Sequence, residues 1–215
     1  LLFSMSTPMV ISFLVQSLYN IVDSIFVARY SPDALAAVSL AYPIQILMIA
    51  VSVGTGVGVN ALLSRLLGEG KKDRAKVTAD NAVLLAIIAS IAFAIFGAIG
   101  TKAFFNAQTN SESIRSLGYS YLSIVSIFSF GLILEVTYER ILQSTGKTIY
   151  NMITQGIGAI INIILDPILI FGLLGAPKMG VAGAAIATVA GQIIAMILSF
   201  IFNMKYNEDV DISFG

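Results

Sequence analysis

The chain has 215 residues, of which 57% are hydrophobic and 11% are charged, and its mean hydropathy is +0.91. Globular domains carry about 25% charged residues and about 45–50% apolar ones, so both a soluble domain and a disordered chain are excluded. The 12 basic residues balance the 12 acidic ones, which argues against a nucleic-acid partner. Cysteine and histidine do not occur, so disulfides and thiolate metal sites are excluded, and any proton chemistry falls to carboxylates.

Six hydrophobic segments follow one another, near residues 4–28, 39–67, 77–100, 116–142, 152–173 and 180–203. Each is close to or longer than the ~20 residues that cross a bilayer as a helix. Lipid offers the backbone no hydrogen-bond partner, and the runs do not alternate as barrel strands would. The sequence therefore predicts an all-α, polytopic membrane protein, a six-transmembrane-helix bundle surrounded by membrane lipids.

The basic residues are unevenly divided between the two ends of this bundle. Eight of the 12 lie at or in the loop near 65–76, in the loop near 140–147 or in the tail after residue 203. The three loops at the opposite end hold the other four. Basic residues collect on the cytoplasmic side of a membrane, so we expect both termini of this segment to be cytoplasmic.

Asp166 is the most conspicuous polar residue inside a span. It lies in an apolar stretch, and Asn162, Gly158 and Gln155 precede it at helical spacing, so all four share one face. A charged carboxylate at this depth costs roughly 2.5–3.5 kcal/mol and needs a partner, a hydrated cavity or a proton. Pro167 removes a backbone donor and frees a carbonyl one turn earlier. These oxygens suit a small cation, whereas the alternative is an Asn–Asp pair that only locks helices together.

The first span carries a second polar face. Gln16, Tyr19, Asn20 and Asp23 stack at spacings of three and four residues, and Pro8 precedes them as a possible kink. A kinked helix has two accessible shapes, which suits a protein that switches between states. The alternative is that Asp23 is simply wetted near the end of the span.

The remaining polar residues of the spans give weaker indications. Glu139 and Arg140 are expected near the cytoplasmic boundary, solvated or paired with a loop, and Glu135 lies deeper, with a chemical role as the less favoured interpretation. Thr188 offers a hydroxyl to a cation site, and Gln192 lies one turn further on. We also expect close helix packing at the small residues of the last span and at the Gly54–Gly58 pair.

These residues carry a resemblance to a known family. The first span, from Pro8 to Asp23, resembles the first helix of the multidrug and toxic compound extrusion (MATE) transporters. The run 162–167 (NIILDP), with the glycine- and alanine-rich 180–185, is similar to the fifth and sixth helices of that family. The run 143–147 (QSTGK) resembles its loop between helices four and five, and the match covers the whole chain in order.

The resemblance implies a function and a site. Family members have twelve helices in two six-helix lobes around a central cavity, so residues 1–215 would be the amino-terminal lobe, and its partner, the carboxy-terminal lobe, would be absent from this chain. The family exports organic cations and other amphipathic drugs from the cell in exchange for Na⁺ or H⁺, so we expect a plasma-membrane antiporter, not an enzyme, with no cofactor besides the coupling ion. The positions implied for coupling are Asp23, Asn162, Asp166 and Thr188, with Na⁺ beside the first three. Residues expected to line the substrate cavity or bend a helix are Pro8, Gln16, Tyr19, Asn20, Gln155 and Gln192.

Three other functions fit less well. An intramembrane aspartyl protease would present a G-x-G-D element, which the sequence lacks. A flippase for lipid-linked precursors would need cationic residues in its cavity to hold phosphates, whereas the intramembrane charges here are mainly acidic. A channel-like bundle would need a pore-lining pattern, and none stands out.

Overall fold

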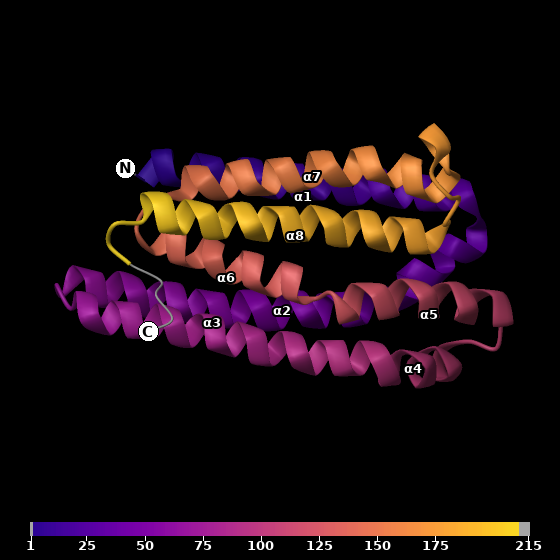
Figure 1. The fold of residues 1–215 in the computed structure, drawn as a ribbon, viewed down its shortest axis with the longest axis horizontal. Coiled ribbons are helices and arrows are strands. Elements are labelled where there is room, and N and C mark those ends of the chain that lie inside the picture. Colours follow the sequence, from indigo (N-terminus) through magenta and orange to yellow (C-terminus); the bar gives the residue numbers. More distant parts are fainter. Residues whose placement is uncertain (1, 211–215) are drawn as a thin grey trace.

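The computed structural model describes the backbone of residues 2–210 and the side chains of residues 6–210. Throughout the described part the regular structure is helical (Figure 1). The elements are α1 (Leu2–Tyr30), α2 (Pro32–Gly68), α3 (Lys72–Ile95), a π-helical turn (Phe96–Gly100), α4 (Thr101–Gln108), α5 (Glu112–Ile127), α6 (Phe130–Ser144), α7 (Thr148–Phe171), a 3₁₀ turn (Leu173–Gly175) and α8 (Val181–Tyr206).

Six membrane spans can be recognised among the described residues, as the sequence predicts. Five helical stretches are long and apolar enough to cross a bilayer, the third being α3 and α4 joined through the π-helical turn, and the bent pair α5–α6 makes the sixth. The prediction of one continuous helix over 116–142 is wrong, because the chain bends by 42° between α5 and α6. The second span begins at residue 32 rather than 39, and the third continues to 108 rather than 100.

The early start of α2 has a local cause. The Ser31 hydroxyl accepts a hydrogen bond from the backbone nitrogen of Ala34 at 3.0 Å, and Pro32 occupies the first helical turn. Serine is a favoured helix cap, and proline at the first position loses no helical hydrogen bond. Only Ser31 therefore separates α1 from α2.

The bend between α5 and α6 faces the π-helical turn of the third span. A Cβ on Gly97 in that turn would lie 2.8 Å from the backbone nitrogen of Ile127 and from the Ser126 Cβ, so the two irregular segments touch. Ser129 continues the contact, because its hydroxyl donates to the Ser90 carbonyl at 3.5 Å. Departures from α-helical pairing are a recognised cause of helix bending.

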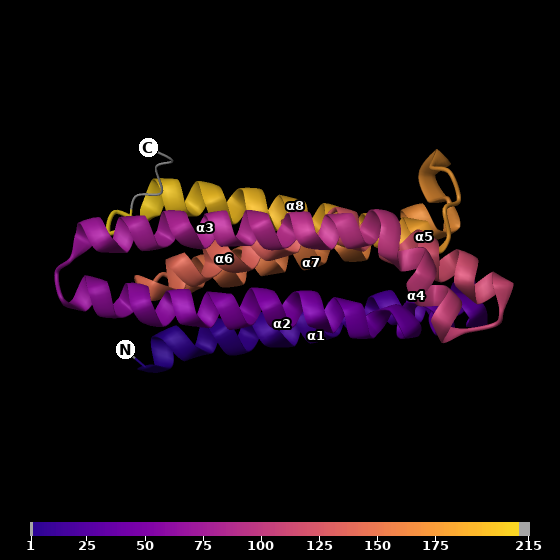
Figure 2. The same ribbon diagram turned by 90° about the horizontal axis from the view of Figure 1, so that it is seen from below.

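The helices run roughly along one axis (Figure 1), and α7 packs against both α1 and α8. Both ends of the described chain lie at the same end of the bundle as the α2–α3 loop (Figure 2). The two groups of loops that differ in basic residues thus lie at opposite ends, as the sequence predicts. Because α7 contacts both α1 and α8, side chains from all three helices can meet along it inside the bundle.

Glycines allow α8 to approach α7 closely. A Cβ on Gly183 would lie 2.6 Å from the Leu169 carbonyl oxygen, and one on Gly191 would lie 2.7 Å from the Gly158 carbonyl oxygen. The predicted packing at these α8 glycines is confirmed. The prediction for Gly54 and Gly58 is wrong within the described chain, because neither has another group within 4 Å of its Cβ position.

Candidate functional site

Two aspartates from different helices meet inside the bundle. Asp166 of α7 is completely buried, and its carboxyl group lies within hydrogen-bonding reach of the Asp23 carboxyl on α1. The Oδ1 atoms of both residues are buried and have no hydrogen-bond partner in the described part of the chain. Two bare carboxylates in contact repel each other, so this arrangement requires a proton or a cation between them.

Asn162 connects this pair to α8. Its amide lies 3.2 Å from the Thr188 hydroxyl. With its nitrogen turned toward Asp166, the amide donates to Asp166 Oδ2 at 3.2 Å. Its oxygen then accepts from the hydroxyl and the backbone nitrogen of Thr188. In this orientation the amide nitrogen has an acceptor and the amide oxygen has donors, so it is the one we adopt. The four residues implied for ion coupling, Asp23, Asn162, Asp166 and Thr188, are thus brought together.

The donor set of this cluster suits a small hard cation or a proton. Carboxylate, amide and hydroxyl oxygens are ligands of hard cations, and the unpartnered Asp23 and Asp166 oxygens are free to bind one. No group of three or more acidic side chains that could hold a metal ion occurs among the described residues. A cation here would therefore rely on neutral oxygens beside the two carboxylates.

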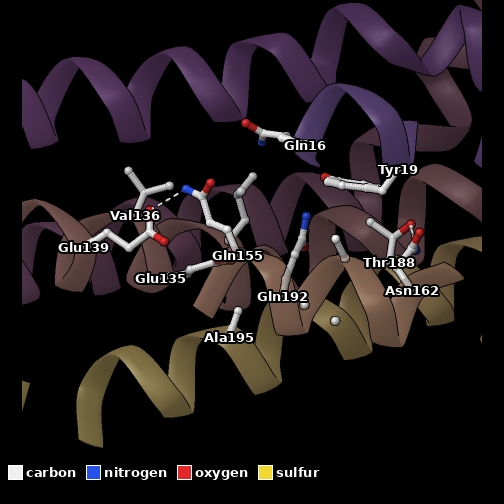
Figure 3. Close-up of a pocket in the computed structure, with 14 residues that line it drawn as sticks. Gln16, Tyr19, Glu135, Val136, Glu139, Gln155, Asn162, Thr188, Gln192 and Ala195 are labelled. Atoms are coloured by element: carbon white, nitrogen blue, oxygen red, sulfur yellow. Dashed lines mark hydrogen bonds between the residues drawn. The ribbon is translucent and has the colours of Figure 1, made fainter. Parts of the chain in front are cut away.

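A small cavity of about 60 Å³, partly open to solvent, lies beside the cluster, between α1, α6, α7 and α8. Figure 3 shows the residues that line it. Its polar lining consists of Gln16, Tyr19, Glu135, Glu139, Gln155, Asn162, Thr188 and Gln192. No lysine or arginine of the described chain is among the lining residues, so the polar lining is acidic or neutral.

Most residues expected at the cavity therefore lie at it, and two do not. Gln16, Tyr19, Gln155 and Gln192 are lining residues. Asn20 is exposed and is not part of the lining, although it shares a helix with Gln16 and Tyr19. Pro8 is buried away from the cavity, and α1 continues through it; its carbonyl accepts from the Ser12 hydroxyl at 2.9 Å. Bending at Pro8 stays a prediction.

The prediction that Glu139 is solvated or paired with a loop is wrong. Its side chain is 3% exposed and accepts hydrogen bonds from Thr154 Oγ1 at 3.1 Å and Gln155 Nε2 at 2.8 Å. Glu135, one turn earlier on α6, is 8% exposed and also lines the cavity. Their four-residue spacing predicts a common face of α6, but it does not indicate which helix that face meets.

The fold and this site define a polytopic α-helical membrane protein with an acidic, buried polar centre. The MatE family model matches residues 8–168 of the chain. The chain is 32% identical to a FAD transporter from Shewanella oneidensis, over 92% of this chain and 44% of that protein. It is 28% identical to the probable multidrug resistance protein YoeA of Bacillus subtilis, over 92% of this chain and 43% of that protein.

The fold has a solved counterpart. It superposes with a TM-score of 0.90 on the outward-facing conformation of a multidrug resistance MATE family transporter of the MOP superfamily. That alignment has 28% sequence identity and covers 98% of this chain but 46% of the other. The chain belongs to the MatE family, and it spans about half the length of the curated relatives it matches.

Proposed function

We propose that this chain is the amino-terminal lobe of a plasma-membrane antiporter that exports organic cations and other amphipathic drugs in exchange for Na⁺ or H⁺. The remainder of the transporter would be a second six-helix lobe, with the substrate route between the two. Two of the relatives support this proposal, since one is a probable multidrug resistance protein and the other is a multidrug resistance transporter.

The observation that carries the proposal is the contact between Asp23 and Asp166. Asp23 belongs to α1 and Asp166 to α7, so the charge of the pair acts between two helices. A proton or Na⁺ at the pair allows the carboxyl groups to touch, and its loss makes them repel. Binding of the coupling ion would then favour one arrangement of α1 on α7 over another, which is how a ligand shifts a conformational equilibrium.

The charge of the residues that line the cavity favours a cationic substrate. The relative from Shewanella oneidensis is a FAD transporter, and FAD carries a diphosphate. A phosphate-bearing substrate, whether a dinucleotide or a lipid-linked precursor, calls for Arg or Lys contacts. The described cavity lining has neither and instead presents Glu135 and Glu139. We therefore propose organic cations for this chain rather than FAD or a flippase substrate.

The test is Asp166→Asn in the full-length gene product that carries this chain. Asparagine keeps the size of the side chain but cannot carry the coupling charge, so we expect ion-coupled efflux of a fluorescent organic cation to be abolished while folding is largely kept. Efflux is measured at equal expression in cells without their own exporters, against imposed Na⁺ and pH gradients, which also identifies the coupling ion. Asp73→Asn, at an exposed position at the start of α3, is the matched control. Unchanged resistance to the drug in the Asp166 variant would refute the proposal.

A further inference from the structure

The cavity has two polar ends. Figure 3 shows Asn162 and Thr188 at one end and Glu135, Glu139 and Gln155 at the other. The Asn162 amide in turn lies 3.2 Å from Asp166 of the coupling pair. Gln155 and Asn162 are seven residues apart on α7, which is about 10 Å along a helix. The glutamate end is therefore separate from the ion-coupling site and needs an explanation of its own.

Glu139 is held as a hydrogen-bond acceptor. One of its oxygens accepts from the Thr154 hydroxyl and the other accepts from the Gln155 amide. Donors on both oxygens favour the ionised carboxylate and fix its orientation. The second polar atom of the Gln155 amide, Oε1, is buried and has no partner. At this end of the cavity the Gln155 nitrogen already donates to Glu139, and the Gln155 oxygen is an acceptor without a donor among the described residues.

Glu135 faces the cavity without a partner. Its side chain is more than nine-tenths buried, lines the cavity and makes no hydrogen bond or ion pair to the described part of the chain. Burial of a charge without a partner is strongly unfavourable. An ionised Glu135 therefore needs a cation that the described part of the lobe does not place beside it.

The nearest cation in the sequence does not fill this role. Arg140 directs its Nη1 to the Gln143 carbonyl oxygen at 2.7 Å, and its side chain packs against Gly56 of α2. The exposed Glu69 provides a contrast, since Lys71 and Arg65 contact it at 2.6 and 2.9 Å and lower the pKa of that carboxyl. Glu69 is thus paired with two cations, whereas no lysine or arginine of the described chain lines the cavity beside Glu135.

We propose that Glu135 and Glu139 bind the protonated amine of the exported molecule. Gln155 Oε1 is a buried acceptor without a partner in the described chain, and the Glu135 carboxyl lines the cavity beside it. Both suit a cation that carries N–H donors, such as an alkylammonium group, rather than a quaternary ammonium. This inference rests on the proposed export of organic cations and assigns recognition of their charged group to a site about three helical turns from Asp166.

The experiment measures probe binding to the purified full-length protein. Three fluorescent probes share one dansyl body and linker: dansylcadaverine with its primary ammonium, its trimethylammonium analogue, and its neutral N-acetyl analogue. They are titrated against the wild type, Glu135→Gln, Glu139→Gln and the control Glu208→Gln, which removes the same charge at an exposed position. Monodispersity in size-exclusion chromatography identifies the folded variants.

The expected result is selective for the ammonium probe. The wild type and Glu208→Gln bind it more tightly than the other two probes, and each cavity variant weakens its binding by about tenfold or more while the N-acetyl probe changes little. Equal weakening of all three probes, or an unchanged affinity for the ammonium probe, would overturn the proposal. If Glu139→Gln does not fold, Glu135→Gln decides, because Glu135 makes no hydrogen bond that folding depends on. Loss of coupled efflux in Asp166→Asn together with unchanged amine binding in Glu135→Gln would leave the antiporter standing and this inference wrong.

Discussion

At the scale of single residues, Asn162 is the link between the coupling pair and the rest of the lobe. Its amide touches Thr188 on α8 and Asp166 on its own helix, so α7 and α8 share one polar network. A buried amide that loses a partner costs about 1–3 kcal/mol. The hydroxyl of Thr188 is one of the two α8 donors, with the backbone nitrogen of the same residue, that hold Asn162 in its orientation toward Asp166.

Replacing Thr188 by valine tests the contribution of this hydroxyl. Valine matches threonine in shape but offers no hydroxyl, so Asn162 keeps only the backbone nitrogen of residue 188 as a donor, and we expect coupled efflux to fall by about tenfold with expression unchanged. Thr188→Ser keeps the hydroxyl and should retain most of the activity. Initial efflux rates at a fixed Na⁺ or pH gradient provide the measurement. Equal rates for the valine variant and the wild type would show that Thr188 has no part in coupling.

What the sequence reveals of the site depends on whether partners share a helix. Asn162 and Asp166 are four residues apart on one helix, so helical periodicity alone predicts that they act together. Glu139 on α6 accepts hydrogen bonds from Thr154 and Gln155 on α7. The periodicity of one helix does not indicate which face of another helix it meets. The place of Glu139 near the end of a hydrophobic segment therefore indicated solvent, whereas α7 and α8 cover it.

At the scale of elements, the bend between α5 and α6 shows why helix continuity is hard to predict. Proline is the sequence signal for a break, but residues 126–130 contain none. The bend is matched by the π-helical turn in the neighbouring span, where Gly97 allows the two backbones to touch. A break that depends on contact between two spans leaves no mark in either segment alone, although the number and order of the spans follow from hydropathy.

The α7–α8 contact yields a prediction for stability. Gly183→Ala places a methyl group 2.6 Å from the Leu169 carbonyl, and because backbone cannot move aside like a flexible side chain, we expect a loss of about 1–3 kcal/mol. Gly156→Ala, on α7 with no other group within 4 Å of its Cβ position, is the control and should be neutral or gain up to about 1 kcal/mol from helix propensity. Thermal unfolding of the purified protein in one detergent measures both variants. A melting temperature for Gly183→Ala at or above that of Gly156→Ala would contradict the close packing.

At the scale of the whole molecule, the two ends of the bundle differ in charge. The α2–α3 loop lies at the same end as both ends of the described chain, and the loop between α4 and α5 lies at the opposite end (Figures 1 and 2). Eight of the 12 basic residues belong to the first end. The bundle geometry fixes which loops lie together, while the charge bias predicts which group is cytoplasmic.

Cysteine labelling tests that orientation, because the chain has no cysteine of its own. Asp73→Cys marks the start of α3 and Asn110→Cys marks the α4–α5 loop; both side chains are exposed. Any cysteine elsewhere in the full-length gene product is first replaced by serine. With the basic end in the cytoplasm, a membrane-impermeant maleimide added to intact cells should label Asn110→Cys and not Asp73→Cys, and permeabilisation should make both reactive. The reverse pattern would place the basic end outside. It would also reverse the direction in which an ion gradient acts on the Asp23–Asp166 pair, and the proposed exchange of an inward ion for an outward drug would then lose its basis.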